Sequence, residues 1–366
     1  MGLQVGIVGL PNVGKSTLFN AITAAKAESA NYPFCTIDPN VGVVNVPDER
    51  LQKISALIKP KSLVPTIIEF LDIAGLVAGA SKGEGLGNKF LGNIRQTDAI
   101  LHVVRCFDDS NVIHVSGSVD PLRDMEVINT ELMLADLESV DSRLKKTEKT
   151  AQSSKDQKLK AEVDLLKRIQ KALNEGLPAR SVEVTEEERP LFKSLHLLSS
   201  KPVLYVCNVD EDSYSKGGNT HSKQVEERAV KEGNSSIMIC SAMEAEIAQL
   251  DPDEQKEFLE SMGLKEPGLH RLIRESYKLL DLITYFTAGE KEVRAWTIRK
   301  GTKAPGAAGV IHSDFEKGFI RAETYACEDL FQLKSEQAVK EAGKYRSEGK
   351  EYVVKDGDIM LFRFNV

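Results

Sequence analysis

The stretch that most constrains the fold is a loop near the N-terminus, Gly9–Ser16, which reads G-L-P-N-V-G-K-S. A short apolar run, residues 3–8, precedes this loop, and residues 17–22 follow it with helical spacing. A strand, a G-x-x-x-x-G-K-S loop and a helix in this order predict backbone N–H groups that surround a phosphate at a helix N-terminus. We therefore expect the chain to bind a nucleoside triphosphate.

Each position of this loop has an expected role. The Lys15 ammonium would reach the β- and γ-phosphates, where it stabilises charge during hydrolysis, and the Ser16 hydroxyl would be a ligand of Mg²⁺. The neighbouring positions are expected to contact the nucleotide as well: Asn12, Val13, Gly14 and Thr17.

Two later segments predict further contacts with Mg²⁺ and the γ-phosphate. Residues 30–40 are rich in Pro and Asn, and Thr36 among them is either a Mg²⁺ ligand or an ordinary surface threonine. Strand-like residues 66–71 end in the D-x-x-G sequence, where Asp72 would hold Mg²⁺ through water. The N–H of Gly75 would meet the γ-phosphate.

The residue after this sequence is Leu76, whereas GTPases that orient the attacking water with a glutamine carry it there. A leucine can neither donate to water nor accept from it, so the site is slow by itself or another group positions the water. His114, in the loop 111–117, is one candidate for that role. The alternative is a loop histidine bonded to the local backbone.

The residues that would recognise the base depart from the guanine pattern. The apolar run 202–207 ends in N-V-D-E, where GTPases carry N-K-x-D, so Val209 replaces the lysine and Glu211 the aspartate. A carboxylate displaced by one methylene loses the bidentate geometry for guanine. Adenine offers an amino donor and ring acceptors, which the Asn208 side chain or nearby backbone could satisfy.

The next apolar run, 236–240, leads into Ser241 and Ala242, which start an S-A-x-x loop expected to contact the base through its backbone. Ordered alternation of strands and loops predicts a doubly wound α/β sheet with its ligand at the carboxyl ends of the strands.

Between about 125 and 200 the pattern changes to apolar residues with three-and-four spacing, from Leu137 to Leu144 and from Leu159 to Leu173. This pattern predicts an antiparallel two-helix hairpin of coiled-coil type. Around its turn, Arg143–Lys160 carries seven basic residues against two acidic ones. The turn is either a site for a polyanion such as RNA or an ordinary solvated helical surface.

The last part of the chain begins with an amphipathic helix at 268–280 and continues in short β-rich pieces from Leu282. A short helix is expected at 307–312. Strands around one helix predict a small α+β module.

Composition limits the remaining choices. A length of 366 residues predicts two or three domains, and 48 Lys+Arg against 55 Asp+Glu give no overall electrostatic case for nucleic acid. The five cysteines form no C-x-x-C pair and no signal peptide is evident, which favours a reduced intracellular compartment. No apolar run approaches the roughly 18 residues of a membrane span. We expect a cytoplasmic protein.

Taken together, these features resemble the YchF family of Obg-like ATPases over the whole chain. The resemblance is carried by Gly9–Ser16, Asn31–Asn40 (N-Y-P-F-C-T-I-D-P-N), Asp72–Gly87, Asn208–Glu211, Thr284–Trp296 and Asp314–Ala322. It implies a GTPase-like domain that hydrolyses ATP, at residues 1–128 and 200–281. It further implies a coiled-coil insert, 129–199, and a C-terminal TGS domain of ubiquitin-like β-grasp fold, 282–366.

The resemblance also implies partners and cofactors. It implies association with the ribosome, particularly the large subunit, in translation or stress responses. Together with the charge of the Arg143–Lys160 turn, it makes this turn and the TGS domain the candidate contacts for RNA. It supports relaxed or adenine preference at Asn208 and Glu211, and it strengthens His114 as a candidate for positioning water. Asn12 resembles the asparagine that binds K⁺ in relatives stimulated by monovalent cations.

Three functional hypotheses follow. The first is a slow Mg²⁺-dependent ATPase switch on the ribosome. The second is a GTPase of the Obg type, and the third is a ribosome- or RNA-binding protein in which the nucleotide is structural.

Overall fold

The computed structural model describes residues 3–24, 40–73, 86–153 and 156–365. Thr36, Gly75 and Leu76, which the sequence singles out, lie outside these ranges. None of the described helices is both long and apolar enough to cross a membrane.

The predicted doubly wound α/β sheet is confirmed, and its strand order is β2-β4-β1-β5-β6-β7. All of its strands run parallel except β2, which pairs antiparallel with β4. Strands β5 and β6 are buried along their whole length, which explains their continuous apolar sequences. The strands are β1 (Gln4–Val8), β2 (Val41–Asn45), β4 (Ile67–Asp72), β5 (Ala99–Arg105), β6 (Val203–Asn208) and β7 (Ser235–Ile239).

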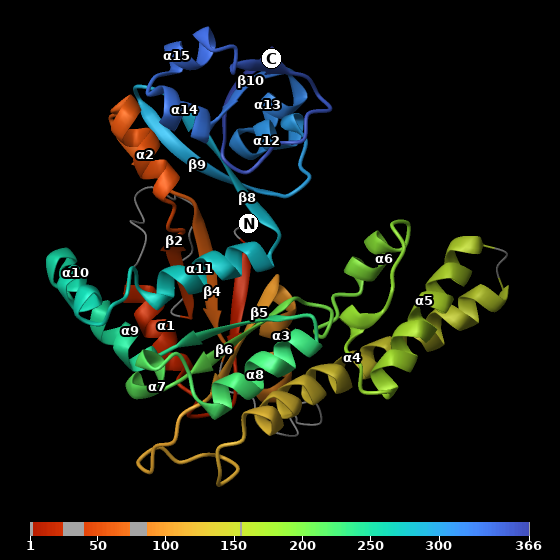
Figure 1. Ribbon diagram of the computed structural model, residues 1–366. Helices are drawn as coiled ribbons and strands as arrows, with labels where there is room; N and C mark the ends of the chain where they lie inside the picture. The colour runs from red at the N-terminus through yellow and green to blue at the C-terminus, as the bar shows by residue number, and fades with distance from the viewer. Residues whose placement is uncertain (1–2, 25–39, 74–85, 154–155, 366) are drawn as a thin grey trace.

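Helices from along the chain pack on this sheet: α1 on β1, β2 and β4, α3 on β1, α8 on β6 and β7, and α11 on β5 to β7. Of the shorter helices, α7 lies between β6 and β7, whereas α9 and α10 lie between β7 and α11. These helices are α1 (Lys15–Ala24), α3 (Leu86–Gln96), α7 (Glu211–Ser215), α8 (Thr220–Lys231), α9 (Ser241–Ile247), α10 (Pro252–Ser261) and α11 (Gly268–Leu279). The carboxyl ends of the parallel strands thus meet at one edge, which lies away from the C-terminal sheet (Figure 1).

The predicted helical hairpin is confirmed and projects sideways from the sheet (Figure 1). It consists of α4 (Pro121–Ser153) and α5 (Gln157–Asn174), with the 3₁₀ turn η2 (Ala179–Ser181) and α6 (Arg189–Ser194) beside it. Its two helices meet through Val140, Leu144, Leu165 and Ile169, all buried. Helix α4 begins at Pro121 as one continuous element, so the boundary expected near residue 128 falls inside a helix.

The C-terminal sheet has the order β11-β10-β12-β8-β9-β3. One apolar cluster joins it to α12 and another to α2 and α14. The strands are β3 (Ser62–Val64), β8 (Leu282–Ala288), β9 (Glu292–Arg299), β10 (Phe319–Ala326), β11 (Arg346–Glu348) and β12 (Asp358–Phe364). The helices are α2 (Glu49–Ile58), α12 (Ala304–Ile311), α13 (Ser313–Lys317), α14 (Cys327–Leu333) and α15 (Glu336–Glu341).

One strand of this sheet, β3, and one helix that packs on it, α2, come from the N-terminal part of the chain. Strand β3 pairs in parallel with β9, and α2 buries Leu51 and Ile54 against Phe286 and Val293. Both elements lie between β2 and β4 in the sequence. A single segment inserted between two strands of the nucleotide-binding domain therefore completes the core of the C-terminal domain.

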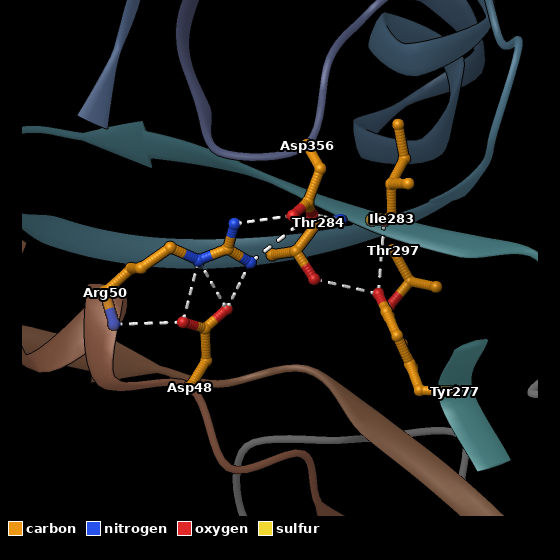
Figure 2. Close-up of polar contacts among 7 residues, drawn as sticks. All are labelled: Asp48, Arg50, Tyr277, Ile283, Thr284, Thr297 and Asp356. Atoms are coloured by element: carbon orange, nitrogen blue, oxygen red, sulfur yellow. Dashed lines mark hydrogen bonds and ion pairs between the residues drawn. The ribbon is translucent and has the colours of Figure 1, made fainter. Parts of the chain in front are cut away.

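A polar junction fixes this segment to the C-terminal domain (Figure 2). The Arg50 guanidinium bonds the carboxylates of Asp48, at 2.8 Å, and Asp356, at 2.7 Å. On the other side, the Tyr277 hydroxyl of α11 bonds Thr284 Oγ1 at 2.9 Å. Side chains from both domains therefore share one hydrogen-bond network.

Candidate nucleotide-binding site

The Gly9–Ser16 loop connects β1 to α1, as its flanks predict. Two of its residues have left-handed backbone, Asn12 at φ 61° and Gly14 at φ 96°. A Cβ on Gly14 would lie 2.2 Å from Asn208 Nδ2, so only glycine fits at that position. Val13 is buried beside it, whereas Ser16 and Thr17 are exposed at the start of α1 and remain open to a ligand.

Lys15 lies inside the loop rather than in solvent. Its side chain is 7% exposed, and its Nζ donates to the Leu10 carbonyl at 2.8 Å. Burial lowers the pKa of this ammonium to about 8, and the nearby Asp72 carboxylate opposes the shift. A desolvated ammonium held close to a phosphate site interacts with an anion more strongly than a solvated one does.

Asp72 ends β4, and burial raises its pKa while Lys15 opposes the shift. Its Oδ1 is buried, and no hydrogen-bond partner for it is found among the described residues. A carboxylate oxygen in this condition fits a divalent cation or its water shell, since hard cations prefer oxygen ligands. The described residues contain no cluster of three or more His, Cys, Asp or Glu for a metal. A Mg²⁺ here would therefore depend on Asp72, hydroxyl groups and phosphate oxygens.

Asn208 joins the two loops that would flank a nucleotide. Its Nδ2 donates to the Val13 carbonyl and its Oδ1 accepts from the Ser241 N–H, both at 2.9 Å. The side chain is 4% exposed. In this structure the amide that the sequence suggested for adenine instead fixes the phosphate loop relative to the loop after β7.

The remaining base-side residues differ in exposure. Val209 is buried, whereas Glu211 is exposed in the first turn of α7. Ser241 is buried, and its Oγ finds no partner within the described residues. Ala242 is exposed at the start of α9.

His114, the candidate for positioning water, is a buried residue of the loop between β5 and α4. It is 8% exposed, its Nε2 lies 2.8 Å from Asp124 Oδ2, and its Nδ1 accepts from the Ser116 N–H at 3.1 Å. Since Nδ1 accepts, the ring is bonded as the tautomer that carries its proton on Nε2. Its neighbour Ile113 is 78% exposed. Both ring nitrogens are engaged within the loop and at α4.

Two buried charged residues next to these loops are not part of any sequence motif described above. Arg105, the last residue of β5, is 1% exposed and bonds the backbone of the following loop. Glu244 is fully buried, and its carboxylate accepts the N–H groups of Gly268 and Leu269, which begin α11. A charged residue directly after an apolar strand was the available signal for Arg105; no local pattern marked Glu244.

These features define a P-loop nucleotide-binding protein with the GTPase-like α/β fold. A family model described as 50S ribosome-binding GTPase matches residues 4–135. The YchF-GTPase C-terminal model, described as a protein of unknown function, matches residues 282–365.

Full-length relatives agree. The chain is 60% identical to the ribosome-binding ATPase YchF of Bacillus subtilis and 56% identical to that of Haemophilus influenzae, with both chains covered completely in each comparison. The solved YchF GTPase of Schizosaccharomyces pombe matches with a TM-score of 0.89 and 42% identity, covering 99% of this chain and 98% of that one. A GTP-binding protein of Pyrococcus horikoshii, at 19% identity and a TM-score of 0.62, shares the fold. The chain belongs to the YchF family.

Proposed function

We propose that the protein is a slow Mg²⁺-dependent ATPase whose nucleotide state controls its binding to the ribosome. The observation that carries the proposal is the arrangement of the phosphate loop and the loop after β7, which the Asn208 side chain joins by two hydrogen bonds. Lys15 is buried in the phosphate loop, and Asp72 lies close to it. The relatives named ribosome-binding ATPase, at 48–60% identity over the full chain, support ATP as substrate and the ribosome as partner.

Phosphate binding and charge stabilisation are the main tasks of the chain's own groups. Lys15 and the N–H groups of the Asn12–Thr17 segment would hold the β- and γ-phosphates. Ser16, Thr36 and Asp72 would hold Mg²⁺, which supplies charge neutralisation on the phosphate oxygens. The N–H of Gly75 would contact the γ-phosphate.

Base recognition would come from the second loop. Ser241, whose N–H bonds the Asn208 side chain, and Ala242 follow β7, and Glu211 is the first residue of α7. The absence of an aspartate at position 211 removes the rigid carboxylate that guanine needs, which favours ATP over GTP. A true GTPase is the alternative, supported by the fold and by the family model and the Schizosaccharomyces pombe relative, both of which are named as GTPases.

His114 is the proposed positioning residue for the attacking water, because no glutamine follows the D-x-x-G sequence. To act, it would have to release Asp124 or Ser116, which it bonds in this structure. This requirement agrees with slow turnover in the absence of a partner. An unchanged turnover rate in His114→Ala would remove the role.

The ribosome contact would include the large subunit, with RNA bound at the Arg143–Lys160 turn and the TGS domain, in the cytoplasm. Part of the positive charge at this turn is neutralised, since Arg143 pairs with Glu162 at 2.7 Å. A K⁺ ion at Asn12 is a further expectation; at present the Asn12 amide donates to the Ile113 carbonyl. Equal turnover in Na⁺ and K⁺ would argue against this ion.

Sedimentation with ribosomes tests the switch. The protein should co-sediment to different extents with ADP, with a non-hydrolysable ATP analogue and without nucleotide. Equal binding in all three states would instead favour a ribosome-binding protein in which the nucleotide is structural.

A further inference from the structure

A buried arginine shapes the loop that connects β5 to α4, residues 106–120. Arg105 ends β5 and is 1% exposed. Its guanidinium donates to the backbone carbonyls of Phe107 at 3.1 Å, Asp109 at 3.2 Å and Val112 at 2.9 Å. It also stacks on the Phe107 ring, 4.6 Å from the centroid.

No carboxylate pairs with this guanidinium in the parts of the chain that the structure describes. A buried cation is costly unless its N–H groups are satisfied, and here three carbonyl oxygens of one loop satisfy them. Removing the guanidinium would take away the bonds that hold the Phe107 and Val112 carbonyls, and would leave the Asp109 carbonyl with the Val112 N–H, at 3.2 Å, as its backbone partner. The conformation of the loop therefore depends on Arg105.

The residue that follows Val112 connects this loop to the phosphate loop. The carbonyl of Ile113 accepts a hydrogen bond from Asn12 Nδ2 at 3.1 Å. Asn12 has a φ of 61°, in the left-handed region that asparagine tolerates better than most residues other than glycine. Its side-chain bond to Ile113 ties this part of the phosphate loop to residues 106–120, two residues before Gly14.

We propose that Arg105 is a positioning residue for nucleotide binding, which acts by holding the Ile113 carbonyl where Asn12 can bond it. Arg105 itself does not touch the nucleotide; its effect passes through Val112, Ile113 and Asn12. The proposal rests on the proposed function in one respect, since it places the nucleotide at the Asn12 loop.

A double-mutant cycle separates this role from a general contribution to folding. The affinity of a fluorescent ATP analogue with Mg²⁺ is measured for the full-length chain and for Arg105→Met, Asn12→Ala and the double variant. Arg105→Met should weaken binding about tenfold, the scale of one or two hydrogen bonds. In the Asn12→Ala background the same change should have less than about a twofold effect, because the contact through which Arg105 acts is already gone.

Arg180→Met is the matched control. Its guanidinium donates to the Ser199 carbonyl at 3.2 Å and lies 3.9 Å from the Glu232 carboxylate, and neither partner belongs to the phosphate loop or to residues 106–120. This variant should leave the affinity unchanged in both backgrounds. Thermal unfolding of every variant reports its folded fraction, and Arg105→Lys, which keeps the charge and loses the forked geometry, replaces Arg105→Met if the latter does not fold.

Two results would overturn the positioning role: an unchanged affinity in the folded Arg105 variants, or equal losses in the wild-type and Asn12→Ala backgrounds. Failure of the proposed function looks different. In that case the wild-type chain itself would bind no nucleoside triphosphate, whereas failure of the positioning role leaves wild-type binding intact.

Discussion

Replacing Asn208 with alanine should weaken nucleotide binding as well as lower the stability of the fold. The side chain bonds the Val13 carbonyl and the Ser241 N–H, each at 2.9 Å, in a buried position. Asn208→Ala leaves both backbone groups without a partner, which should lower the free energy of unfolding by about 2–4 kcal/mol.

The same change removes the side chain that links the phosphate loop to the loop after β7. The energy of ordering these loops must then come from the nucleotide, so its affinity should fall about tenfold or more, equivalent to about 1.4 kcal/mol. Calorimetric titration with an ATP analogue and Mg²⁺ measures this affinity, and urea unfolding followed by circular dichroism measures the stability.

Asn129→Ala is the control. Asn129 Nδ2 donates to the Tyr205 hydroxyl at 3.2 Å, within the same domain and apart from both loops. Its loss should lower stability by about 1 kcal/mol and leave the affinity unchanged. An Asn208→Ala variant that is destabilised as expected but binds the nucleotide within twofold of wild type would refute the claim that nucleotide binding depends on the Asn208 link between the two loops.

Three further predictions concern the junction, the lysine and the metal. Arg50→Met should lower the free energy of unfolding in urea by roughly 1–3 kcal/mol, because the ion pairs of Arg50 are half-buried. Lys53→Met on the same helix breaks an exposed ion pair and should cost under about 0.5 kcal/mol. Equal losses in the two variants would contradict the role of Arg50 at the junction. Since the pKa of Lys15 is about 8, its charged form disappears as the pH rises, and ATP affinity should fall from about pH 7.5 to about pH 9 in wild type but stay level in Lys15→Met. Asp72→Asn should raise the Mg²⁺ concentration that half-saturates ATP binding about tenfold, and an unchanged Mg²⁺ titration would exclude Asp72 from the metal site.

Much of the fold could be predicted because its signals are local. The apolar strands with their bounding residues, the helical spacing of the hairpin and the loop motif each lie within short windows. The membership of β3 in the C-terminal sheet could not, since Ser62–Val64 is three residues long and its partner β9 lies more than two hundred residues away. Such a pairing is decided by tertiary packing of α2 and β3.

The candidate site was predicted less evenly. Residue types and spacing identified Gly9–Ser16, Asp72 and Asn208, but they did not reveal what each side chain bonds. Asn208 was considered for the base, whereas it joins two backbone segments. His114 was considered for water, whereas its ring bonds Asp124 and Ser116. These contacts depend on side-chain orientation in the folded chain, which the periodicity of the sequence does not determine.

The claim that the protein is an ATPase switch is tested most directly by comparing the affinities of ATP and GTP analogues with Mg²⁺ by isothermal titration calorimetry. The account predicts tighter binding of the ATP analogue, because Val209 is buried where GTPases carry a lysine and Glu211 is exposed where they carry a fixed aspartate. A GTP analogue that binds about tenfold more tightly, a difference of about 1.4 kcal/mol, would contradict it.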